Sequence, residues 1–223
     1  MVELLAMPHV RVKICGITHP DDLRAAVDAG ADAVGFNFYP QSSRFVDTAT
    51  AGPLIRATPP SVEPVGVFVE ARADEMREIA MCLGLRAVQW HGDGSPPEGD
   101  LGPIPFYVAA RVRCEGCLAG IRNMVASRRS SVTPIAAVLI DAHVPGQFGG
   151  TGQTAPWHLL AGFDPGVPVI LAGGLTPENV AEAIRIVKPW GVDVASGVES
   201  SPGRKDAEKM RRFVEAVRSV QDG

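Results

Sequence analysis

The sequence has few cysteines, little net charge and no long apolar run, and each shortage excludes a class of protein. Four cysteines in 223 residues are too few for a disulfide scaffold, so we expect a cytoplasmic protein. The formal net charge is only −4 and basic residues are scattered, which argues against a nucleic-acid partner. No apolar run reaches the roughly 18 residues of a membrane span, and the first ten residues do not resemble a signal peptide.

Cysteine and histidine residues spaced like metal ligands are also scarce. Cys114 and Cys117 have CxxC spacing, but a zinc site needs a second pair of ligands, and a thioredoxin-type motif would follow the first strand of a small fold. A structural or incidental role is therefore favoured for this pair over a redox or metal role. The histidines without ligand-like spacing are His9, His19, His143 and His158. We expect no metal and no organic cofactor.

Glycine and proline, by contrast, are abundant: the chain has 24 and 19 of them, which indicates many turns. Between the turns, short β-branched runs alternate with amphipathic stretches. The predicted strands are 12–17, 33–38, 64–69, 87–91, 106–112, 136–141, 168–172 and 192–196. The predicted helices are 20–29, 48–57, 73–83, 116–127, 156–162, 177–187 and 206–220, with a short or broken helix within 92–105.

Eight strand–helix units in unbroken alternation predict an α/β fold, a single (β/α)8 TIM barrel. We expect one domain over residues 1–223, in which residues 1–9 form a disordered or extended N-terminal extension. An open doubly wound sheet is the alternative, because periodicity does not show whether a sheet closes.

Uncommon polar residues stand at the predicted strand ends, where a barrel of this kind has its active face. Lys13 and Cys15 alternate with apolar residues in the first strand and so share a face. Asp141 ends the sixth strand, and a buried carboxylate there is costly unless it is paired or functional. Asp193 lies on the eighth strand, which neighbours the first on closure, so we expect an ion pair between Lys13 and Asp193.

Glycine turns follow the last two strands. Gly173 and Gly174 end the seventh strand, and Ser196 and Gly197 follow the eighth. Loops at these two places often form a phosphate site in barrels, because glycine lets an anion approach backbone N–H groups. The sequence therefore indicates a phosphorylated ligand.

These segments together resemble the phosphoribosylanthranilate isomerase family of tryptophan biosynthesis, from about residue 10 to the end. The matching segments are VKICGIT (12–18), GFNFYPQSSRFV (35–46), VQWHG (88–92), GGTG (149–152), LAGGL (171–175), DVASGVE (193–199) and PGRKD (202–206). The combination is specific, although a single Gly-Gly turn occurs in many barrels.

The resemblance implies an Amadori rearrangement without a cofactor, acting on a small phosphosugar substrate. It implies Asp141 as the general acid, Cys15 as the general base, and Arg44 as the partner of the substrate carboxylate. The phosphate would lie on Gly173, Gly174, Ser196 and Gly197, and the loop 143–154 would close over the substrate. Gln89 and His91 share a face and are candidates for the substrate pocket, with a structural role for His91 as the alternative. The protein would be a monomer or homodimer.

The chain departs from the family pattern at Trp90, at Ala195 and in the stretch 154–157, none of which touches the proposed acid, base or arginine. A ribulose-phosphate epimerase is a weaker alternative because its metal-ligating residues are missing. A thiamine-phosphate synthase is a weaker alternative because it would lack the pair Cys15 and Asp141. A non-catalytic phosphosugar-binding relative is also weaker, because such a protein would have no need of this pair.

Overall fold

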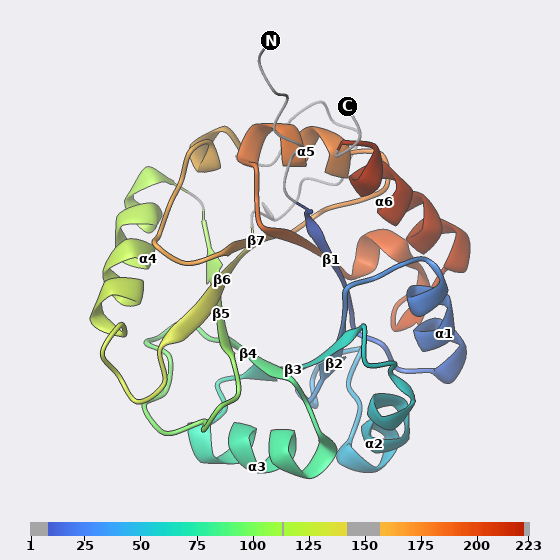
Figure 1. Ribbon diagram of the computed structural model, residues 1–223, viewed down its shortest axis with the longest axis horizontal. Coiled ribbons are helices and arrows are strands. Elements are labelled where there is room, and N and C mark those ends of the chain that lie inside the picture. The colour runs from blue at the N-terminus through green and yellow to red at the C-terminus, as the bar shows by residue number, and fades with distance from the viewer. Residues whose placement is uncertain (1–8, 113, 142–156, 221–223) are drawn as a thin grey trace.

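The computed structural model describes residues 9–112, 114–141 and 157–220. Eight parallel strands follow one another around a closed barrel, and β8 pairs with β1 to complete it. Figure 1 looks down the barrel and shows the strands as an inner ring within a ring of helices. The predicted (β/α)8 barrel is confirmed, and the open sheet is wrong. Residues 1–8 of the predicted N-terminal extension, like the loop 143–154, lie outside the described residues.

The strands of the barrel are β1 (Arg11–Cys15), β2 (Ala33–Asn37), β3 (Glu63–Val69), β4 (Ala87–His91), β5 (Phe106–Arg111), β6 (Ile135–Asp141), β7 (Val169–Ala172) and β8 (Gly191–Val194). The helices are α1 (Pro20–Asp28), α2 (Thr48–Ala57), α3 (Ala73–Leu83), α4 (Glu115–Ser127), α5 (Val180–Val187) and α6 (Ala207–Ser219). Two 3-10 helices, η1 (Trp157–Leu160) and η2 (Ser196–Val198), and a short hairpin of β9 (Glu199–Ser201) and β10 (Arg204–Lys205) complete the described elements.

The helices differ from the prediction in three places. Between β4 and β5 the described chain has no helix; its backbone carbonyls at Pro96 and Pro97 instead accept hydrogen bonds from Arg128 Nη2. The predicted helix 156–162 is the shorter 3-10 helix η1. Helix α5 begins at Val180, three residues later than predicted, because the side chain of Asn179 accepts a hydrogen bond from the backbone of Thr176 and closes a turn there.

The strands bury apolar side chains on both faces, as expected for a parallel sheet covered by helices. The large cluster between strands and helices contains Phe36, Phe106 and Phe213, each almost fully buried. A smaller cluster fills the barrel: Ala33, Val65, Ala87, Tyr107, Ala137, Leu139, Ile170 and Ala172. Among the described residues, no helix is both long and apolar enough to cross a membrane.

Candidate active site

The predicted acid, thiol and histidine end their strands at the same edge of the barrel. Cys15 is the last residue of β1, His91 of β4 and Asp141 of β6. All barrel strands are parallel, so these carboxyl ends open on one face. A cavity of about 280 Å³ between helix α4 and the ends of β4, β5 and β6 is lined by His91, Arg111 and Asp141, and Cys15 and Arg44 do not line it. The structure therefore brings the histidine and the carboxylate to one hollow.

A buried ion pair crosses the seam where the barrel closes. Lys13 Nζ lies 2.8 Å from Asp193 Oδ1, and the two residues are register partners on β1 and β8. Their side chains are only 5% and 10% exposed. Burial opposes the charge of Lys13, but the attraction of Asp193 and Cys15 outweighs it and raises the pKa of Lys13 above its ordinary value. The ion pair expected from the sequence is confirmed.

The same lysine reaches across the barrel to β4. Lys13 Nζ donates to Gln89 Oε1 at 3.0 Å, and Gln89 Nε2 lies 2.6 Å from His91 Nε2. Strands β1 and β4 are not neighbours, so these side chains meet inside the barrel. Burial, then the nearby charge of Lys13, lowers the pKa of His91 to about 4, so the imidazole is neutral at pH 7.

Cys15 is buried between cations. The charges of Lys13 and Lys205 favour the thiolate, but burial is the larger effect and raises the pKa of the Cys15 thiol above its ordinary value. Its register partner on β2 is Gly35, where an added Cβ would lie 2.9 Å from Cys15 Sγ. Any side chain at position 35 would therefore restrict the space that the Cys15 thiol occupies.

Arg44 lies directly over the turn that follows Cys15. Gly16 has φ +81°, and a Cβ there would stand 2.5 Å from Arg44 Cδ, so glycine is needed for this contact. Arg44 Nε and Nη2 donate to the two carboxylate oxygens of Glu199, each at 2.7 Å. Arg44 Nη1 takes part in none of the hydrogen bonds formed by the described residues. It is therefore the nitrogen of this guanidinium that a ligand could contact.

Glu199 and Lys205 complete this ion cluster, and neither was among the site residues predicted from the sequence. Lys205 Nζ lies 2.9 Å from Glu199 Oε1, and the antiparallel pairing of β9 with β10 brings the two residues together. Burial would raise the pKa of Glu199, but hydrogen bonds from Arg44 and Lys205 outweigh it and hold that pKa below its usual range. The segments DVASGVE and PGRKD contained both residues, but nothing in their spacing showed that Glu199 binds both Arg44 and Lys205.

The glycine turns after β7 and β8 lie side by side. Gly173 and Gly174 both have positive φ, +89° and +66°. A Cβ on Gly197 would stand 1.9 Å from the carbonyl oxygen of Leu175, so only glycine allows the two loops to approach this closely. Asn179 Nδ2 donates to the carbonyl oxygen of Gly174 and holds the first loop in place. Ser196 begins η2 in the second loop.

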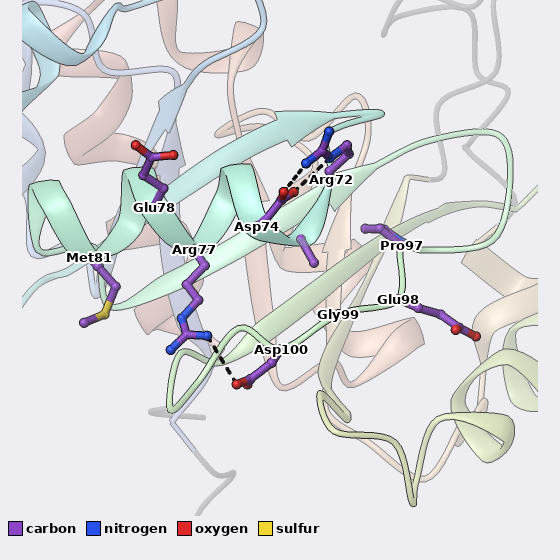
Figure 2. Close-up of a pocket in the computed structure, with 10 residues that line it drawn as sticks. Arg72, Asp74, Arg77, Glu78, Met81, Pro97, Glu98, Gly99 and Asp100 are labelled. Atoms are coloured by element: carbon purple, nitrogen blue, oxygen red, sulfur yellow. Dashed lines mark hydrogen bonds and ion pairs between the residues drawn. The ribbon is translucent and has the colours of Figure 1, made fainter.

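A larger hollow, of about 800 Å³, lies away from these residues (Figure 2). It is a groove on the outer surface between α3 and the segment 97–100. The ion pairs Arg77–Asp100 and Arg72–Asp74 lie along it, the first at 3.3 Å. None of the predicted site residues lines it. Size alone therefore does not locate the active site.

Within the described ranges, no group of three or more His, Cys, Asp or Glu residues is placed to hold a metal ion. Cys114 and Cys117 stand at the start of α4 with their sulfur atoms 3.3 Å apart, which is beyond a disulfide bond.

Fold and strand ends define a (β/α)8 barrel with its polar residues gathered at the carboxyl face. Residues 12–216 match the family N-(5'phosphoribosyl)anthranilate (PRA) isomerase. The chain is 49% identical to N-(5'-phosphoribosyl)anthranilate isomerase of Myxococcus xanthus over 95% of this chain and 97% of the relative. It is 44% identical to that of Thiobacillus denitrificans, over 94% and 98%. The chain therefore belongs to the N-(5'-phosphoribosyl)anthranilate isomerase family.

Solved structures agree with this assignment. Phosphoribosyl anthranilate isomerase of Thermotoga maritima superposes with a TM-score of 0.80 at 36% identity, covering 95% of this chain and all of that one. A second phosphoribosyl anthranilate isomerase structure, in complex with reduced 1-(o-carboxyphenylamino)-1-deoxyribulose 5-phosphate, superposes with a TM-score of 0.78 at 34% identity, over 95% and 100%. A third describes monomers generated from the dimeric T. maritima enzyme.

Proposed function

We propose that this chain converts N-(5'-phosphoribosyl)anthranilate into 1-(2-carboxyphenylamino)-1-deoxyribulose 5-phosphate in tryptophan biosynthesis. The reaction is an Amadori rearrangement, an intramolecular aldose–ketose isomerisation. The observation that carries the proposal is the arrangement at the carboxyl face: a buried thiol beside Lys13 and Arg44, and a carboxylate at the end of β6. Family membership supports the same substrate, and the product-like compound bound to one relative supports the same site.

Asp141 acts as the general acid. It gives its proton to the ring oxygen of the ribose, the bond from C1 to that oxygen breaks, and a Schiff base forms at C1. Cys15 acts as the general base and takes the proton from C2, which gives an enol. The enol then loses its hydroxyl proton while C1 gains a proton, and the ketone at C2 results. A thiolate of raised pKa is a strong base once formed, and the charges of Lys13 and Lys205 stabilise it in the buried site.

Arg44 holds the carboxylate of the anthranilate ring. A guanidinium fork suits this partner, and Glu199 fixes its plane through Nε and Nη2 while Nη1 is left for the substrate. The phosphate lies on Gly173, Gly174, Ser196 and Gly197, where the close approach of two glycine turns supports an anion site.

The test is the turnover of two variants, Cys15→Ala and Asp141→Ala, measured by the loss of substrate fluorescence. Each removes a proton-transfer group, so kcat should fall by about 10²–10⁴. Cys82→Ala on α3 and Asp28→Asn on α1 are matched controls, because both side chains are exposed. Near-normal turnover by either site variant would refute its role. Failure of the wild-type gene to rescue a tryptophan auxotroph lacking this step would refute the activity.

Cys15, His91 and Asp141 end strands of the same barrel, so we propose a complete site in each protomer, whether the protein is a monomer or a homodimer. We also propose that the reaction proceeds in the cytoplasm. It needs no cofactor, because the described acid, base and arginine supply every group the steps require.

A further inference from the structure

The hydrogen bonds of Gln89 determine where the proton of His91 must be. A lysine ammonium only donates, so the Gln89 atom that faces Lys13 Nζ at 3.0 Å must be its carbonyl oxygen. The other end of the amide is then its NH2 group, which lies 2.6 Å from His91 Nε2. An amide NH2 also only donates, so His91 Nε2 must accept and carries no proton.

A neutral imidazole has one ring proton, which therefore stays on Nδ1. An imidazolium is disfavoured because its Nε2–H would point at the NH2 group of Gln89. Desolvation opposes the charged form as well, and it is the largest reason that the pKa of His91 is lowered. The charged residues that act on the ring are Lys13, Asp193, Asp141 and Arg111, and burial outweighs the two carboxylates among them.

The orientation of Gln89 depends in turn on Asp193. The carboxylate holds Lys13 Nζ at 2.8 Å, and Lys13 holds Gln89 Oε1, so one chain of contacts runs from β8 through β1 to β4. Gln89 itself is only 1% exposed, and both its Oε1 and its Nε2 atom form a hydrogen bond within the protein. It is therefore placed to position His91 rather than to contact a ligand.

We propose that Lys13 and Gln89 fix His91 as the Nδ1–H tautomer, a neutral hydrogen-bond donor in the cavity that Asp141 also lines. His91 then donates Nδ1–H to an acceptor oxygen of the bound phosphosugar and does not act as a base. This second statement rests on the proposed function, whereas the tautomer does not. Gln89 is a positioning residue that acts through His91.

The tautomer is tested on the ligand-free protein with ¹⁵N-labelled histidine, by long-range ¹H–¹⁵N NMR. The His91 signal is assigned by its loss in His91→Asn. We expect a protonated Nδ1 and an unprotonated Nε2 at pH 7. A protonated Nε2, or a rapid mixture of the two tautomers, would overturn the proposal. This measurement needs no turnover, so it stands apart from the test of the isomerase activity.

Gln89→Glu tests the cause. A carboxylate at this position can accept from both Lys13 and His91, so the ring proton should move to Nε2 and the pKa of His91 should rise. The signal of His19, an exposed residue before α1, should be the same in both proteins. If Gln89→Glu folds, as judged by circular dichroism, and keeps the Nδ1–H tautomer, the positioning role is wrong. If it does not fold, Gln89→Met replaces it, and a loss of the single fixed tautomer is expected.

The donor role is tested by comparing substitutions at position 91. Asparagine places an N–H near the position of Nδ1–H, whereas leucine has no donor. We expect kcat/KM of His91→Asn to stay within about tenfold of the wild type, and that of His91→Leu to fall by about 10–100-fold, as for one lost hydrogen bond. Equal losses in the two variants would overturn the donor role and leave the NMR result to decide the tautomer.

Discussion

Replacing Lys13 by methionine would test how much the closure of the barrel depends on one buried charge. The substitution keeps most of the side-chain volume but leaves Asp193, whose side chain is 10% exposed, without its cation. It also removes the donor to Gln89. Breaking a buried pair in this way costs about 3–5 kcal/mol, because an uncompensated carboxylate stays in a medium of low polarity. That is a large part of the roughly 5–15 kcal/mol by which domains are stable.

For a chain of this length each kcal/mol lowers Tm by about 2–4 °C, so Lys13→Met should unfold about 6–20 °C earlier. Thermal unfolding followed by circular dichroism measures this. Arg24→Met is the matched control, because Arg24 forms an exposed ion pair with Asp21, and its Tm should move by less than about 2 °C. The double variant Lys13→Met with Asp193→Leu should recover most of the loss, since no charge is then buried.

The reasoning would be refuted if Lys13→Met and Arg24→Met lowered Tm equally. It would also be refuted if the double variant were less stable than Lys13→Met, because the single variant would then owe its loss to packing and not to an unpaired carboxylate.

Three further predictions follow from particular residues. Gly35→Ala puts a Cβ 2.9 Å from Cys15 Sγ, so kcat should fall at least tenfold, and an unchanged kcat in the steady-state assay would show that the thiol tolerates displacement. Gly120→Ala in α4 meets nothing within 4 Å and should raise the free energy of unfolding by about 0.5–1 kcal/mol in urea titration. His91 is neutral in the fold but gains a proton when unfolded, so stability falls as the pH drops from about 6.5 to about 4. Over that pH range the free energy of unfolding of His91→Asn should fall by about 3 kcal/mol less than that of the wild type. Equal falls in the two proteins would contradict the low pKa of His91.

The strands could be predicted from the sequence because each is a short β-branched run between turns. The ion pair of Lys13 with Asp193 could be predicted as well, since closure makes the first and last strands neighbours and the side-chain alternation puts both residues on one face. Both inferences use local periodicity and one topological rule.

The partners of Arg44 and of His91 could not be predicted in the same way. Arg44 and Glu199 are 155 residues apart, and a hairpin after β8 brings Glu199 back toward the barrel. Gln89 and His91 could be placed on one face, but which end of the amide faces the ring depends on the reach of Lys13 from another strand. Such contacts depend on side-chain rotamers in three dimensions, which no spacing in the sequence records.

The pairing of β1 with β8 can form only late in the synthesis of the chain. Lys13 and Asp193 are separated by 180 residues, so at typical rates of synthesis, about 5–20 residues per second, the lysine waits about 10–35 s for its carboxylate to be made. During that interval the first strand has no partner on one edge and its thiol is not yet enclosed. We therefore expect Cys15 to be alkylated faster in truncated nascent chains lacking β8 than in the completed barrel, where it is only 9% exposed.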